Sequence, residues 1–290
     1  MKIINKISSY ILGASALLLA SSCDDDGGKV IDEVFSSTTR GAVLRTIDSY
    51  GFYDRFDTSS VFGFTFEEQD YEAGALLEKV DLYISYDDDT EENGDSSVDE
   101  ILIETFLPED FTESDFGLPV ASYESTLANA LDLLGLNESE IEGGDAIQYR
   151  LILTLTDGRT FTNDDSTGTI TGSFFDAPFF YGPVIKCIPP APVPGEYTIS
   201  FVDSKGDGWN GASIDVVIDG EASSYTLEDG TTGLAMFTVP DGTTEFTLEF
   251  VSGSADSEVT YKIIAPTEET AFSDGPSPTK GNITLNICKG

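Results

Sequence analysis

Hydrophobic and polar residues alternate along most of the chain, and this period of two predicts β-strands. Phe62, Phe64 and Phe66 share one face of such a segment, and residues 146–155 alternate without interruption. Half-buried antiparallel strands have this pattern, so we predict a mostly β protein. The same period recurs at Val80 to Tyr86, Tyr197 to Phe201, Ile214 to Ile218, Phe246 to Phe250, Val259 to Ile263 and Ile283 to Ile287.

One segment has the helical period instead. Leu127, Leu131 and Leu134 fall on one face of a predicted helix that begins after Ser125 as N-cap and stops at Gly135. Residues 137–140 (Asn-Glu-Ser-Glu) have the pattern of a capping box and predict one further turn. We expect the helix to cover one end of a β-sandwich.

Turn and linker signals divide the chain into two folded parts. Four Asp-Gly pairs predict hairpin turns, and four prolines within residues 188–194 predict a stiff linker. We predict two antiparallel β-sandwich domains: an Ig-like one at 38–187 with a helical insertion, and a jelly-roll-like one at 195–290. The Asp-Gly pairs assigned to hairpin turns are Asp157-Gly158, Asp219-Gly220, Asp229-Gly230 and Asp241-Gly242.

The first residues are typical of an export signal. Lys2 and Lys6 precede an apolar run from Tyr10 to Ala20, which is too short to span a bilayer. The residues before Cys23 resemble the lipobox of bacterial lipoproteins, although alanine replaces the leucine expected three positions before the cysteine. We predict a signal peptide at 1–22, acylation (palmitate) of Cys23 and an acidic tether at 23–37. The alternative is an ordinary signal peptide that is cut at residues 20–22.

The triple aspartate at 24–26 resembles the export signal of Bacteroidetes surface lipoproteins. The resemblance implies an outer-membrane protein that is lipid-anchored and faces the cell exterior. Residues 38–185 resemble accessory lipoproteins of starch-utilisation-type uptake systems. That resemblance implies a binding module that captures a glycan or peptide for an outer-membrane transporter. The alternative is a structural spacer or adhesin, stabilised by calcium and a disulfide, with no small-molecule ligand.

Charge narrows the classes of partner. The sequence has 14 basic and 53 acidic residues, a formal net charge of −39. Without the leader lysines the charge is −41, so nucleic acid, whose binding depends on Lys and Arg, is excluded as a partner. The chain has no histidine, which excludes imidazole catalysis and histidine metal sites. We do not expect the protein to be an enzyme. A glycosidase would need one close pair of acids, but among 53 acidic residues such pairs occur by chance and do not indicate an active site.

With Cys23 assigned to the anchor, Cys187 and Cys288 remain as an even pair in an exported chain. A disulfide between them is the prediction, closing a loop of 101 residue steps.

The segment 203–211 (Asp-Ser-Lys-Gly-Asp-Gly-Trp-Asn-Gly) could bind calcium. The side chains of Asp203, Asp207 and Asn210 and the carbonyl of Trp209 are the predicted oxygen ligands, with Glu258 as a distant one. Lys205 at its third position and Ile214 at its twelfth exclude an EF-hand. The segment resembles a loop of β-sandwich modules in Bacteroidetes surface proteins. The alternative is a glycine-rich loop that is held by aspartates accepting backbone N–H groups.

Aromatic residues could provide a ligand surface. Five lie within residues 174–181, and the only tryptophan is Trp209. Packing is the interpretation we favour for the 174–181 cluster, because large apolar patches on soluble proteins are usually covered. The predicted ligand contacts are Trp209, Phe175, Phe179, Phe180 and Tyr181. The acidic run 87–92 is expected to be a solvated loop.

Overall fold

The computed structural model of the protein describes residues 40–90, 94–172 and 174–289. Cys23 and the acidic tether lie outside this part of the chain, so acylation stays a prediction. Among the described residues, no helix combines the length and the hydropathy that a membrane span requires.

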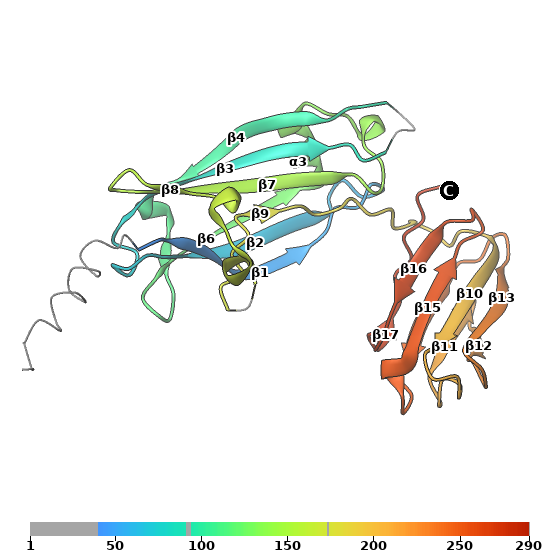
Figure 1. Cartoon of the computed structure of the whole chain (residues 1–290). Coiled ribbons are helices and arrows are strands. Elements are labelled where there is room, and N and C mark those ends of the chain that lie inside the picture. Colours follow the sequence, from blue (N-terminus) through green and yellow to red (C-terminus); the bar gives the residue numbers. More distant parts are fainter. Residues whose placement is uncertain (1–39, 91–93, 173, 290) are drawn as a thin grey trace, which may run out of the picture. The chain divides into compact units, whose positions relative to one another are not determined.

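The protein has a β-sandwich fold, as predicted. Figure 1 colours its strands by their position in the sequence. In residues 43–181 one sheet has the order β1-β2-β6-β5 and the other the order β4-β3-β7-β8, with β9 pairing on β7. All of these pairs are antiparallel. The strands are β1 (Val43–Gly51), β2 (Val61–Gln69), β3 (Leu77–Asp87), β4 (Val98–Phe106), β5 (Thr112–Glu113), β6 (Pro119–Thr126), β7 (Ala146–Leu155), β8 (Thr160–Phe161) and β9 (Phe180–Tyr181).

Aromatic side chains join the two sheets of this first sandwich. Phe64 of β2 stacks on Tyr181 of β9 with ring centroids 4.0 Å apart, and its ring also lies 5.9 Å from that of Tyr149 on β7. All three side chains are buried. Every second residue of β7 is buried, as its uninterrupted alternation predicts.

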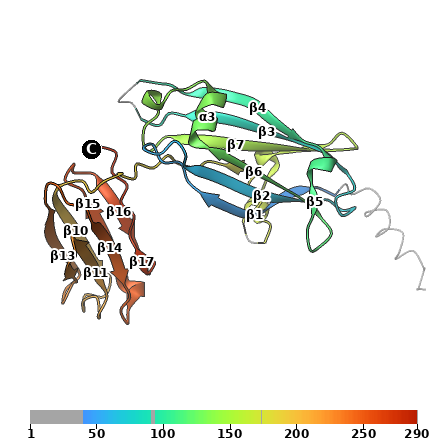
Figure 2. The same ribbon diagram turned by 180° about the vertical axis from the view of Figure 1, so that it is seen from behind.

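Helix α3 (Leu127–Leu134) contacts β6 of one sheet and β3 and β4 of the other. Figure 2, in which the molecule is seen from behind, shows the helix on the near side of this sandwich. The predicted leucine face is buried, and Gly135 ends the helix in the left-handed conformation. The N-cap is Thr126 rather than the predicted Ser125, because the hydroxyl of Thr126 accepts the N–H of Asn129 at 3.1 Å.

Short helical turns connect the remaining strands. The turn η2 (Glu138–Glu140) has the predicted capping box, in which Glu140 accepts the backbone N–H of Asn137 at 2.8 Å. The others are η1 (Pro108–Asp110), η3 (Asn163–Asp165), α4 (Gly168–Thr171) and η4 (Asp256–Glu258).

The second sandwich has two four-stranded sheets, β13-β10-β15-β16 and β12-β11-β14-β17. The rings of Phe250 (β14) and Tyr261 (β15) stack across them at 5.7 Å. The strands are β10 (Gly195–Asp203), β11 (Ser213–Ile218), β12 (Glu221–Tyr225), β13 (Thr232–Val239), β14 (Phe246–Val251), β15 (Val259–Ile264), β16 (Thr270–Asp274) and β17 (Gly281–Asn282).

Two of the four predicted hairpin turns are hairpins. Asp157-Gly158 joins the paired strands β7 and β8, and Asp219-Gly220 joins β11 and β12. Asp229-Gly230 and Asp241-Gly242 instead carry the chain from one sheet to the other, because β13 pairs with β10 and not with its neighbours in sequence. An Asp-Gly pair fixes the local turn, whereas tertiary packing selects the strand partner.

The predicted strand at Ile283 to Ile287 is also wrong, since only β17, just before it, is a strand. The N–H of Ile283 donates to Leu248 O, and that of Ile287 donates to Cys187 O, both at 2.8 Å. The stretch therefore changes partners along its length, although the side chains of Ile283 and Ile287 are buried as the alternation predicts.

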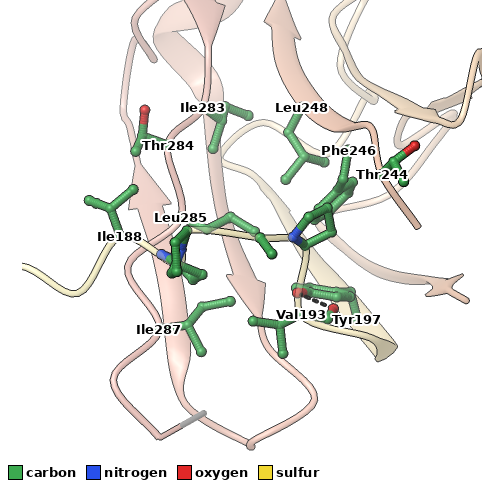
Figure 3. Close-up of a pocket in the computed structure, with 14 residues that line it drawn as sticks. Ile188, Val193, Tyr197, Thr244, Phe246, Leu248, Ile283, Thr284, Leu285 and Ile287 are labelled. Atoms are coloured by element: carbon green, nitrogen blue, oxygen red, sulfur yellow. Dashed lines mark hydrogen bonds between the residues drawn. The ribbon is translucent and has the colours of Figure 1, made fainter. Parts of the chain in front are cut away.

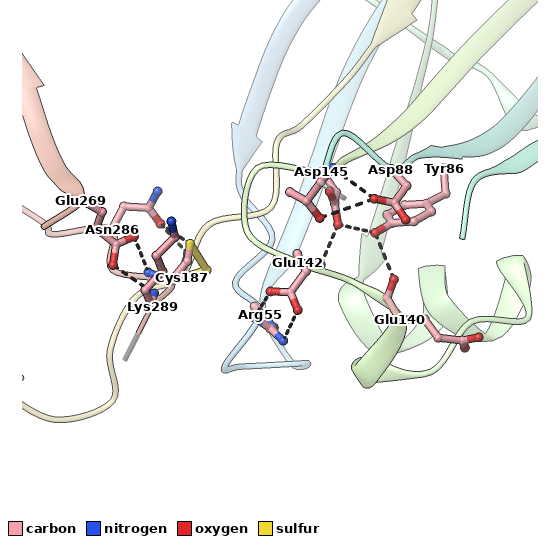
Figure 4. Close-up of polar contacts among 12 residues, drawn as sticks. Arg55, Tyr86, Asp88, Glu140, Glu142, Asp145, Cys187, Glu269, Asn286 and Lys289 are labelled. Atoms are coloured by element: carbon pink, nitrogen blue, oxygen red, sulfur yellow. Dashed lines mark hydrogen bonds and ion pairs between the residues drawn. A yellow bond between two sulfur atoms is a disulfide. The ribbon is translucent and has the colours of Figure 1, made fainter. Parts of the chain in front are cut away.

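The predicted disulfide between Cys187 and Cys288 is present. Around it, Asn286 accepts the N–H of Cys187 at 2.5 Å, and Glu269 accepts the N–H groups of Cys288 and Lys289 at 3.0 Å (Figure 4). The end of the chain is thus fastened to the residue that precedes the proline-rich segment.

Candidate functional site

The loop 203–211 connects β10 to β11 and has an ordered backbone geometry. Gly206, Gly208 and Gly211 all have φ between +83° and +92°, and Asn210 has φ +52°. At Gly208 a side chain could not fit, because its Cβ would lie 2.4 Å from Glu228 O. Glycine is therefore required for the close approach of this loop to residues 227–228.

Asp203, the last residue of β10, holds the loop through hydrogen bonds to its backbone. Its buried carboxylate accepts the N–H of Lys205 at 3.0 Å, of Gly206 at 3.0 Å and of Gly208 at 2.8 Å. These donors, the N–H of Lys205 above all, hold the pKa of Asp203 below its usual range. Asp203 is therefore ionised and preorganised, as the alternative interpretation of the loop requires.

Trp209 fixes the loop to the core. Its side chain is fully buried and packs edge-to-face on Phe201 with ring centroids 4.7 Å apart. The indole N–H donates to Val202 O at 3.1 Å, and the backbone N–H donates to Leu227 O at 2.8 Å. The predicted ligand contact at Trp209 is therefore wrong for this structure, because the ring does not reach solvent.

Three carboxylates meet above the loop. One oxygen each of Asp203, Asp207 and Glu258 lies within 4.8 Å of the others. Glu258 belongs to η4, and its side chain is 11% exposed. Its Oε1 forms an ion pair with Lys205, whereas its Oε2 is buried and has no hydrogen-bond partner among the described residues. An acceptor of that kind is a suitable ligand for a cation.

The structure brings together two of the four predicted calcium ligands, Asp203 and Asp207, and adds the distant one, Glu258. The ligand roles of Trp209 and Asn210 stay predictions. The carbonyl of Trp209 accepts the N–H of Ala212 at 2.9 Å, and Asn210 donates to Gly208 O at 2.7 Å through its amide nitrogen and not through its side-chain oxygen. Calcium needs about six to eight oxygens. The three carboxylates fit it as a partial set that water would complete.

The predicted aromatic ligand surface is mostly buried. Phe179 and Tyr181 are buried, and Tyr181 shares a hydrogen bond with Thr46 at 2.9 Å. Phe175 and Phe180 are half-buried. Phe174 is exposed, and the Arg45 guanidinium lies 4.9 Å from its ring centroid. Packing is thus the main role of this cluster, and the predicted contacts at Phe179 and Tyr181 are wrong for this structure.

Asp145 holds the acidic run after β3 (Figure 4). Its fully buried carboxylate accepts the hydroxyl of Tyr86 and the N–H groups of Glu142 at 2.6 Å and Asp89 at 3.2 Å. Burial and this carboxylate raise the pKa of Tyr86. The described part of the run is therefore anchored by hydrogen bonds.

A small pocket of about 310 Å³ lies between the proline-rich segment and the second sandwich (Figure 3). Tyr197, Phe246 and Leu285 line it, and the Tyr197 hydroxyl donates to Val193 O at 2.9 Å. Among the described residues no charged side chain lines it, and most of the lining side chains are apolar.

Three features of these sites are not among the predictions from sequence. The first is the ion pair of Lys205 with Glu258, for which a lysine among aspartates is itself a signal. Asp145 and the pocket gave no signal, because each depends on segments that are distant in sequence.

No protein-family model matches the chain, and no curated protein matches it. Among solved structures it is similar to a bacterial adhesin from Mobiluncus mulieris that contains intramolecular disulfide, isopeptide and ester bond cross-links. In one crystal form the identity is 12% and the TM-score 0.24, with 73% of this chain and 81% of the adhesin covered. In a second form the identity is 11% and the TM-score 0.23, with 73% and 80% covered. This similarity is too low to assign a function.

Proposed function

We propose that the protein is a lipid-anchored outer-membrane protein, exposed at the cell surface, that acts as a rigid spacer or adhesin. Cys23 would carry the lipid, and no small-molecule ligand or catalytic step is involved. The burial of Trp209 supports this proposal most directly. The residue with the best chemistry for stacking on a sugar or peptide serves instead to fix a loop to the core.

The disulfide gives the second sandwich the mechanical property that a spacer needs. Cys187 precedes its first strand and Cys288 follows its last, so the bond closes a loop that contains all eight strands. Tension applied at the two ends of this sandwich is carried by the covalent bond and not by the strands.

A calcium ion would add a second constraint in this proposal. Asp203 ends β10, whereas Glu258 directly precedes β15 in the same sheet. An ion held by Asp203, Asp207 and Glu258 would connect the loop to the neighbouring strand and offset the repulsion among three carboxylates.

Single-molecule pulling between the two ends of the full chain tests the mechanical role. With the disulfide oxidised, the second sandwich should add no unfolding step. After reduction it should add one of about 340 Å, since each residue extends by about 3.3–3.6 Å. A step of that length in the oxidised protein would contradict the proposal. Mass spectrometry of Cys23 and protease treatment of intact cells test the anchor and the exposure separately.

A binding module for a transporter is the second candidate, and the pocket in Figure 3 favours it. Its volume is near the lower limit of about 300 Å³ for small-ligand pockets. The apolar side chains in its lining would accommodate an aliphatic or aromatic side chain of a peptide. Binding of apolar peptides that is lost on Leu285→Arg, together with recovery of a transporter by cross-linking on cells, would favour this function over a spacer.

A further inference from the structure

The edges of the four sheets differ in how they are protected against pairing. The edge strands β5, β8, β9 and β17 have only two residues each. The register shifts along β1, β4 and β16, and β12 is a short strand that begins with Glu221. These are the usual devices that prevent further strand addition. The edge strand β13 has none of them.

Strand β13 is long, regular and uncharged. Its eight residues pair with β10 in one unbroken register and include no charged residue and no proline. Leu234 and Met236 are 68% and 55% exposed on its outer face. A strand of this kind is a template for another strand.

The backbone groups of β13 that point away from β10 include those of the same two residues. The N–H of Asp203 donates to Thr231 O at 2.8 Å, and in an antiparallel pair the bonded positions alternate. Gly233 and Ala235 therefore bond to β10, whereas the N–H and C=O groups of Leu234 and Met236 point away from it. In the part of the chain that the structure describes, no other segment bonds to them.

We propose that β13 is a docking edge that takes an extended segment of a partner protein as a fifth strand of this sheet. Backbone groups of Leu234 and Met236 would provide the hydrogen bonds, and their side chains would cover alternate apolar side chains of the added strand. The inference is independent of the anchor, the ion and the spacer role.

Charge indicates the composition of the partner segment. Exposed acids lie at both ends of the uncharged edge, Glu228 and Asp229 before it and Asp241 after it. A segment with an apolar centre and basic residues at its ends is complementary to this arrangement.

The same charges disfavour a second copy of the chain as the occupant. Antiparallel pairing of two β13 strands about Ala235 would place Asp229 of one copy opposite Asp241 of the other. Like charges directly opposite are destabilising. A parallel arrangement would also bring acidic ends together.

The test uses the full chain and two synthetic peptides as probes. One has the sequence Lys-Lys-Val-Thr-Val-Thr-Val-Thr-Lys-Lys, and in the other glutamate replaces each lysine. Fluorescence anisotropy should show binding of the lysine peptide and at least tenfold weaker binding of the glutamate peptide. Amide hydrogen exchange should slow at Leu234 and Met236 when the lysine peptide is present. Equal affinity for the two peptides, or protection confined to other strands, would overturn the proposal.

Met236→Pro and Met236→Val form the matched pair of variants. Proline removes an outward N–H without breaking the β10 pairing, so it should weaken peptide binding at least tenfold, whereas valine should retain it. Near-ultraviolet circular dichroism checks that both variants fold. If the proline variant does not fold, the amide hydrogen exchange of the unmodified chain with the lysine peptide decides whether β13 is the docking edge. Sedimentation could instead detect a dimer of the unmodified chain that Met236→Pro does not form. The occupant of β13 would then be a second copy of the chain, and the proposal would be overturned.

Discussion

Lys205 forms an ion pair with Glu258 although the two residues lie 53 positions apart. The lysine side chain is 69% exposed, whereas that of Glu258 is 11% exposed. The Glu258 carboxylate raises the pKa of Lys205 by accepting its hydrogen bond. The ammonium group thus neutralises part of the charge of Asp203, Asp207 and Glu258, and it competes with any ion that these carboxylates bind.

Removing this internal cation should strengthen calcium binding. We expect Lys205→Met to raise the calcium affinity by about tenfold at low ionic strength, and by less in high salt because the ammonium is exposed. Isothermal titration calorimetry measures the change. Lys262→Met, on the outer face of the same sheet, is the matched control and should change the affinity little.

Neutralising a carboxylate of the cluster should weaken calcium binding. Glu258→Gln and Asp207→Asn should each weaken calcium binding at least tenfold, since each replaces a charged ligand by a neutral amide. The absence of calcium heat in both the unmodified chain and Lys205→Met would contradict the cation site and leave the loop as a purely hydrogen-bonded structure.

Trp209 provides a spectroscopic test of the second core. Because it is the only tryptophan and is fully buried, its emission should be blue-shifted in the folded protein and should move to the red on unfolding. Trp209→Ala should lower the free energy of unfolding by about 3–5 kcal/mol, the usual cost of deleting a large buried ring. Urea titration followed by circular dichroism measures this cost. A loss below about 1 kcal/mol would mean that the ring does not anchor the loop.

Glu68 should make the stability of the protein depend on pH. It is fully buried on β2, neither of its carboxylate oxygens has a hydrogen-bond partner among the described residues, and burial, followed by the charge of Asp70, raises its pKa from 4.5 to about 8. The folded state then holds a proton that the unfolded state has released. Stability is therefore highest below pH 4.5 as far as this group is concerned, and falls between pH 4.5 and about 8.

Glu68→Gln checks this assignment because glutamine resembles the protonated acid. Each pKa unit corresponds to about 1.4 kcal/mol, so the unmodified chain should lose several kcal/mol over this range, and the variant should lose much less. Thermal unfolding between pH 5 and pH 8 measures the difference. Glu72→Gln, an exposed acid in the following loop, is the control, and a pH profile unchanged by Glu68→Gln would reject the assignment.

The parts of the fold that the sequence predicts well are those with a local cause. Strand β7 is predicted to the residue because both its period and its flanking turn are local, and the helix end at Gly135 follows from a local αL conformation. Strand β13 has no such local signal and is not predicted. As an edge strand it exposes Leu234 and Met236, so its hydrophobic residues do not alternate with polar ones.

The sequence predicts part of the candidate site. The glycines and aspartates of the loop indicate a tight turn with inward oxygens, and Asp203 and Asp207 do meet. The direction of the Trp209 ring depends on β10 and residue 227, and the partner of Lys205 comes from η4. No local pattern specifies these contacts.

The disulfide should stabilise the second sandwich chiefly through the unfolded chain. It closes a loop of 101 residue steps, for which chain entropy gives about 4–5 kcal/mol at 25 °C. Cys187→Ala with Cys288→Ala should therefore lower the free energy of unfolding of this sandwich by about 2–5 kcal/mol, as measured by urea titration of Trp209 emission. The folded state should be affected mainly near residues 283–289, whose backbone changes partners from Leu248 to Ala271 and Cys187. Hydrogen exchange should accelerate there and remain slow in β10 and β15. Equally fast exchange in the central strands would instead mean that the bond maintains the folded sandwich itself.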